Sequence, residues 1–111
     1  MTFSPSSIDI SLADRAAARR QSDLCRVFAN MHRVLILWML ETGELTVSEL
    51  AEGLELSMPG TSQHLQRMKM SGVVTTRRDG KLIYYRLTED KGRHACHLFG
   101  QAAYLELPEV G

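Results

Sequence analysis

The stretch LTVSELAEGLELSMPGTSQHLQRMKMSG, residues 45–72, predicts two short helices separated by a tight turn. The first begins with a capping box, in which the Thr46 hydroxyl and the Glu49 carboxylate each satisfy a free backbone amide. The second begins at Ser57, a good N-cap, and Pro59 is tolerated because the first helical turn needs no donor there. Two such helices, the second basic and polar on one side, predict a helix-turn-helix.

Two more helices are predicted before this motif. Residues 12–29 place apolar side chains at helical spacing, which marks one apolar stripe. The members of this stripe are Ala17, Leu24, Phe28 and Met31. Residues 34–40 are all apolar, and a helix that is apolar all round belongs at the centre of a small domain. Gly43 then provides a C-terminal cap.

A β-hairpin is predicted after the motif, in residues 73–87, VVTTRRDGKLIYYRL. Asp79 and Gly80 form a preferred two-residue type I′ turn between two runs of β-forming residues. This turn sets a register that pairs Val74 with Tyr85. The predicted inner face of the hairpin consists of Val74, Ile83, Tyr85 and Leu87.

The last predicted helix runs from Glu89 to about Leu105. The complete order of elements is typical of a mostly α (α+β) fold, a winged helix-turn-helix with a two-stranded wing and an extra dimerisation helix at each end. We expect this domain at residues 13–106, between a flexible arm at residues 1–12 and a tail at residues 107–111. Because the outer helices have apolar stripes with little left to cover them, we expect a second copy of the chain to pack there.

Positive charge is concentrated in one segment, although the whole chain has a formal net charge of zero. Residues 56–87 carry six Lys or Arg against one acidic residue, a balance of +5. The segments before and after it have balances of −3 and −2. The basic segment coincides with the helix-turn-helix and the hairpin, which predicts double-stranded DNA as the partner.

The composition also bears on compartment and chemistry. Two cysteines cannot form a disulfide framework, and this favours a reducing cytoplasm. The first ten residues lack the features of a secretion signal, and no apolar run approaches the roughly 20 residues that span a bilayer. We therefore expect a cytoplasmic protein without a membrane partner. Since the sequence has no paired acids, P-loop or nucleophile–base arrangement, we expect neither enzyme activity nor a cofactor.

Four segments resemble the ArsR/SmtB family of bacterial transcriptional repressors. They are ANMHRVLIL (residues 29–37), GELTVSELAEGLELS (43–57), TSQHL (61–65) and RRDGKLIYYRL (77–87). The resemblance extends from Leu24 to Leu87. Members of this family are homodimers that occupy operator DNA and leave it when an effector binds. The resemblance therefore implies a dimeric, sequence-specific repressor.

The second helix of the motif is expected to enter the major groove, while the wing touches the DNA backbone or the minor groove. The resemblance assigns direct contact to Ser62, Gln63 and His64, and a glutamine can pair bidentately with adenine. Arg67 and Lys69 are suited to phosphates, which bind without reading sequence. The complete predicted DNA-binding set is Thr61, Ser62, Gln63, His64, Arg67, Lys69, Arg77, Arg78 and Lys81.

Metal sensing has little support in the sequence. The family's heavy-metal repressors often carry cysteines at positions held here by Thr46 and Ser48, and hydroxyls are poor ligands for soft metals. A second family site begins with an Asp-x-His pair, but Gly92 stands where that histidine would be. His94 and His97 remain as two candidate ligands on one helix, and their simpler interpretation is a solvent-facing pair.

The two cysteines support a redox hypothesis. Some family members resemble persulfide or oxidant sensors, with one cysteine in the buried helix and one in the last helix, but Trp38 occupies the first position here. Cys25 is the substitute partner for Cys96 if their Cα atoms lie within about 7 Å. The alternative is that both are small packed residues. An alternative to the repressor itself is a protein-interaction or antirepressor module that has lost DNA binding, and the inducer is left unassigned.

Overall fold

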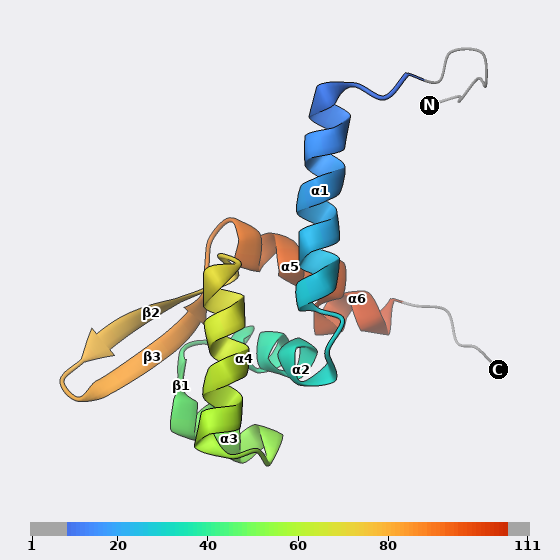
Figure 1. Ribbon diagram of the computed structural model, residues 1–111. Helices are drawn as coiled ribbons and strands as arrows, with labels where there is room; N and C mark the ends of the chain where they lie inside the picture. Colours follow the sequence, from blue (N-terminus) through green and yellow to red (C-terminus); the bar gives the residue numbers. More distant parts are fainter. Residues whose placement is uncertain (1–8, 107–111) are drawn as a thin grey trace.

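The structure, a computed structural model, describes residues 9–106 (Figure 1). The elements follow in the order α1 (Leu12–Val27), α2 (Met31–Leu40), β1 (Leu45–Thr46), α3 (Val47–Leu54), α4 (Met58–Met70), β2 (Val74–Asp79), β3 (Leu82–Leu87), α5 (Lys91–Phe99) and α6 (Gln101–Leu105). This is a winged helix-turn-helix, as expected from the sequence. The expected arm at residues 1–12 lies mostly outside the described residues, and the expected tail lies entirely outside them.

The helix starts predicted from local sequence are confirmed. The Thr46 hydroxyl accepts a hydrogen bond from the Glu49 amide, and the Glu49 carboxylate accepts one from the Thr46 amide, which completes the capping box of α3. The Ser57 hydroxyl accepts from the Gly60 amide at 3.0 Å and so caps α4. These caps fix the residues at which α3 and α4 begin.

The core lies where α2, α3 and α4 meet. Ile36, Leu37, Leu50, Leu65 and Met68 are all fully buried there. The prediction that α2 is the central helix is therefore confirmed. The stripe predicted for the first helix is confirmed only in part, because the described α1 buries its C-terminal end while the rest of the helix is exposed.

The β-sheet has three strands in the order β1-β3-β2, where two were predicted. The predicted register is wrong by two residues, because Val74 pairs with Leu87 and Asp79 pairs with Leu82. The turn residues are therefore Gly80 and Lys81. Gly80 has φ +63°, and a positive φ at the first central position alone fits a type II′ turn in place of type I′.

The two-residue shift leaves the alternation of faces unchanged, so Val74 and Tyr85 still face the same side. One member of the predicted inner face is nevertheless exposed: Ile83 retains 40% of its surface in solvent. The hairpin extends past the helices at this point (Figure 1), so nothing remains for its tip to pack against.

The last helix is divided in two, and the prediction of one continuous helix is wrong. Gly100 separates α5 from α6 with an extended ψ of 168°. A Cβ at Gly100 would meet the Cys96 carbonyl oxygen and Glu41 Oε1. Glu41 Oε1 instead accepts from the Gln101 amide at 3.2 Å, and Trp38 Nε1 donates to the Phe99 carbonyl at 2.9 Å. The break is thus held from α2 and its C-terminal cap.

The N-terminal half of α1 stands clear of the rest of the molecule (Figure 1). The Cα radius of gyration is 16.9 Å, against about 13 Å for a compact domain of this length. No helix in residues 9–106 is long and apolar enough to cross a membrane. The exposed N-terminal half of α1 therefore has no close packing partner among residues 9–106.

Candidate nucleic-acid interface

Helix α4 divides into a buried face and an exposed face. Leu65 and Met68 anchor it in the core. Ser62 and Gln63 are exposed in its first turns, and Arg67 is exposed further along the same helix. The basic residues lie in the last turn, where the negative end of the helix favours them. The helix therefore presents short polar side chains at its start and cations toward its end.

Thr61 is the one member of the predicted DNA-binding set that the structure removes. Its side chain is fully buried, and its hydroxyl donates to the Ser57 carbonyl at 2.9 Å. It cannot reach a base edge from this position. The signal was present in the sequence, because Thr61, Leu65 and Met68 share the i, i+4, i+7 spacing of one helix face.

His64 is half-buried between α4 and the start of α2, so only part of its ring faces outward. Its Nδ1 lies 3.2 Å from Arg33 Nη1, and its ring centroid is 5.4 Å from that of His32. Burial first, and then the charges of Arg33 and His32, lower the pKa of His64. The neutral imidazole is therefore favoured, with Nδ1 free to accept from the guanidinium. The His64 ring therefore contacts the start of α2, and its exposed part remains open to solvent.

The wing carries cations in two different states. Arg77 forms a bidentate ion pair with Glu44, at 2.9 Å and 3.0 Å to its two carboxylate oxygens, and its guanidinium lies 4.8 Å from the Tyr84 ring centroid. This hydrogen bonding raises the pKa of Arg77 and lowers that of Glu44. Arg78 and Lys81 are exposed and have no carboxylate within 4 Å among residues 9–106.

Arg86 was missed by the sequence reasoning. It is exposed on β3, pairs with Thr75 across the hairpin and has no ion-pair partner among the described residues. The alternation of β3 could have identified it, because Arg86 follows Tyr85 and therefore points to the opposite face. Arg86 is therefore a further cation of the wing, on the face that carries Arg77 and opposite to the face that carries Arg78, and its charge helps to lower the pKa of Glu44.

Comparison with known proteins agrees with this geometry. Residues 30–76 match the family model described as "Bacterial regulatory protein, arsR family". HlyU of Vibrio vulnificus CMCP6, described as a transcriptional regulator, superimposes with a TM-score of 0.71 and 31% identity over 84% of this chain and 94% of that one. The chain belongs to the arsR family.

Curated relatives in the family are regulators as well. The HTH-type transcriptional regulator KmtR of Mycobacterium tuberculosis is 42% identical over 71 residues, which is 64% of this chain and 55% of that protein. The biofilm growth-associated repressor of Agrobacterium fabrum is 40% identical over 68 residues, which is 61% of this chain and 58% of that protein. This chain thus matches little more than half the length of these relatives. The Mycobacterium bovis domain Mb0332, described as homodimeric and DNA-binding, has a TM-score of 0.71 at 29% identity.

Within this arsR-family chain, the two cysteines are free and differ in environment. Cys25 is exposed on α1, whereas Cys96 is half-buried on α5. Burial, followed by the carboxylate of Glu41, raises the pKa of the Cys96 thiol to about 11. The thiolate is the reactive form of cysteine, so Cys96 is not activated for redox chemistry at neutral pH.

The candidate metal ligands do not gather into a site. His94 Nε2 lies 3.2 Å from Gln21 Oε1, and His97 is exposed. No group of three potential ligands among His, Cys, Asp and Glu occurs in residues 9–106. Gly92 is buried, and a Cβ there would stand 2.6 Å from the Val73 carbonyl oxygen. A histidine at this position, which the family's site would require, has no room.

Proposed function

We propose that this chain is a transcriptional repressor that binds operator DNA as a homodimer. The proposal is carried by two exposed surfaces of different character, the polar first turns of α4 and the cationic wing. The polar residues Ser62 and Gln63 lie on the first turns of α4, and the free cations of the wing follow after a three-residue link from α4 to β2. Such an arrangement suits a helix in the major groove with a hairpin on the flanking phosphates. In this proposal the protein works in the cytoplasm, together with the DNA.

In this proposal the contacts on DNA have two roles. Gln63 forms hydrogen bonds with a base edge. The Ser62 hydroxyl can both donate and accept, so it is compatible with different bases. Arg67, Lys69 and the wing residues neutralise phosphates, so they contribute affinity and salt dependence without reading the sequence. The neutral overall charge of the chain makes this local surplus more important, because no general attraction to DNA adds to it.

Dimerisation through the first and last helices is supported by their exposed apolar side chains. Leu12 on α1 is 86% exposed and Leu105 on α6 is 72% exposed. The projecting half of α1 needs a surface to pack against, and a second copy provides one. A two-fold dimer would set its two α4 helices in successive major grooves, about 34 Å apart, on a near-palindromic site.

Fluorescence anisotropy with labelled DNA from the chain's own promoter region, set against a shuffled duplex, tests this function. We expect Gln63→Ala to reduce the preference for the promoter sequence by about tenfold, the loss of one good base contact. Gln101→Ala removes another exposed glutamine, at the start of α6, and should leave the preference unchanged. Equal affinity of the unaltered chain for both duplexes would contradict sequence-specific binding and favour the protein-interaction module.

Control of the repressor by thiol oxidation has weaker support than DNA binding. The exposed Cys25 is accessible to oxidants, and its position on α1 would link its oxidation to dimerisation. The raised pKa of Cys96 works against the second half of such a switch. An effector that acts at a different place in the fold therefore has to be considered.

A further inference from the structure

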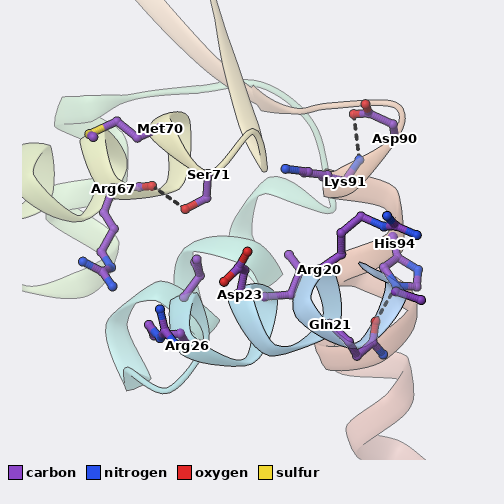
Figure 2. A pocket seen from close by; sticks show the side chains of 13 residues that line it. Arg20, Gln21, Asp23, Arg26, Arg67, Met70, Ser71, Asp90, Lys91 and His94 are labelled. Atoms are coloured by element: carbon purple, nitrogen blue, oxygen red, sulfur yellow. Dashed lines mark hydrogen bonds between the residues drawn. The ribbon is translucent and has the colours of Figure 1, made fainter. Parts of the chain in front are cut away.

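A cavity of about 710 Å³ lies between α1, the C-terminal end of α4 and the start of α5 (Figure 2). This volume is within the range of small-molecule binding sites. Ala17, Leu24 and Val27 of α1 contribute apolar surface to it. Met70 of α4 also lines it and is 80% exposed.

Positive charge exceeds negative charge around this cavity. Its charged lining consists of the cations Arg20, Arg26, Arg67 and Lys91 and the acids Asp23 and Asp90. None of the four cations has a carboxylate within 4 Å among residues 9–106. Asp90 Oδ1 is already occupied, since it accepts from the Lys91 amide at 2.7 Å. The remaining imbalance favours an anion.

The cavity joins the helix proposed to bind DNA to the helices proposed to form the dimer. Figure 2 shows Arg20 and Asp23 of α1, Lys91 of α5, Arg67 of α4 and Ser71, the residue that caps the end of α4, around the same open space. The Lys91 side chain lies over the end of α4, because a Cβ at Gly72 would stand 3.2 Å from Lys91 Cδ. Arg67 belongs to both sites, because it lines the cavity and is also a proposed contact to a DNA phosphate.

We propose that this cavity is an effector site for a small organic anion that has an apolar part. The anionic group would be held by the cations from α1, α4 and α5, and the apolar part would cover Leu24, Val27 and Met70. An anion bound there neutralises Arg67 and so opposes DNA binding. By thermodynamic linkage, bound DNA must reduce the affinity for the anion by the same factor. Only this coupling rests on the proposed function.

The first experiment uses the full chain without DNA and two fluorescent probes. One is 8-anilinonaphthalene-1-sulfonate, and the other is N-phenyl-1-naphthylamine, which has the same rings without the sulfonate. We expect one saturable site per chain and at least tenfold tighter binding of the sulfonate. Equal affinity for the two probes would overturn the proposal, because it would show that only apolar surface is recognised.

Charge variants of opposite sign locate the site. We expect Arg20→Gln and Lys91→Gln each to weaken sulfonate binding by about threefold, and Asp23→Asn to strengthen it by a similar factor. Arg15→Gln removes an exposed cation from α1 outside the cavity and should change nothing. Partial unfolding exposes apolar surface and raises binding of this sulfonate, so it cannot account for the weaker binding expected of Arg20→Gln and Lys91→Gln. Unchanged affinity in Asp23→Asn overturns the site.

The methionine methyl signals in NMR spectra provide an independent location. Met70 should shift on addition of the sulfonate probe, while Met31, which is exposed on α2 outside the cavity, should not. Loss of probe binding as the dimer forms would overturn the proposal and show that a second copy fills the cavity.

DNA anisotropy with and without the sulfonate probe then tests the coupling. A fall in DNA affinity at saturating probe supports it, and an unchanged affinity refutes it. A chain that binds the probe but no DNA refutes the proposed function alone and leaves the anion site standing.

Discussion

Gly92→Ala tests how tightly the last helices are joined to the sheet. Gly92 is the second residue of α5 and is buried. An added Cβ would stand 2.6 Å from the Val73 carbonyl oxygen and 2.9 Å from Leu87 Cβ. One of these atoms is backbone and the other is attached directly to it, so neither can rotate away. Overpacking of this kind costs about 1–3 kcal/mol, and the smaller entropy of the unfolded alanine chain returns up to about 1 kcal/mol. We expect a net loss of about 2 kcal/mol.

Gly53→Ala is the matched control, because Gly53 also lies inside a helix. A Cβ there would meet only the terminal methyl and the sulfur of Met39, the far end of a flexible side chain. Met39 can turn aside, and alanine is favoured over glycine within a helix by about 1 kcal/mol. We therefore expect Gly53→Ala to be neutral or slightly stabilising.

Urea unfolding followed by far-UV circular dichroism measures both variants. The protomer concentration must be held constant, since dimerisation would contribute to the apparent stability. With the slope usual for a small domain, a loss of 2 kcal/mol lowers the urea midpoint by about 1 M. If Gly92→Ala is as stable as Gly53→Ala, α5 does not pack closely against Val73 and β3.

Three further predictions concern titration, charge and thiol reactivity. Burial and neighbouring positive groups lower the pKa of His64 below its ordinary 6.5, so the folded chain binds fewer protons than the unfolded one and stability falls as the pH drops below that value. His64→Gln should flatten this part of a pH–stability curve, and an unchanged curve would count against it. Glu44→Gln releases Arg77 from its ion pair, so DNA affinity should rise and the slope of log K against log salt should steepen by about 1. Anisotropy at several salt concentrations measures both quantities, and a weaker or unchanged affinity would contradict the prediction. At pH 7.5 iodoacetamide should alkylate Cys25 at least tenfold faster than Cys96, whose pKa of about 11 leaves little thiolate. Equal rates by peptide mass spectrometry would show that Cys96 is accessible and activated.

The features that could be predicted from the sequence depend on residues close together in the chain. A capping box needs two residues three positions apart, and Thr46 with Glu49 supplied it. The central position of α2 follows from its composition alone, because a helix with apolar residues on every side has no polar face to turn toward solvent. The basic segment could likewise be assigned to one part of the fold without knowledge of any contact.

The predictions that were wrong concern features that depend on contacts between residues distant in the sequence. The break at Gly100 is held by Glu41 and Trp38 from α2, about 60 positions earlier, while the helical periodicity of the segment continues across it. The hairpin register depended on whether Asp79 or Lys81 joined Gly80 in the turn, and both choices preserve the alternation of faces. Thr61 was assigned by its chemical type, although its spacing from the buried residues decided its side.

The two proposed sites lie on one rigid helix, and this leads to a distinction that experiment can make. Gln63 and Met70 are seven residues apart on α4, about 10 Å along its axis, and fully buried Leu65 and Met68 hold the helix between them. An anion in the cavity can oppose DNA binding by neutralising Arg67, or by drawing the end of α4 toward α1 and tilting its start. Neutralisation should lower the salt slope of DNA binding by about 1 and leave sequence preference unchanged. Tilting should reduce the preference read by Gln63 and leave the slope unchanged. Because a packed core resists gradual deformation, we expect the first result, and a loss of preference at constant slope would show that α4 moves as a body.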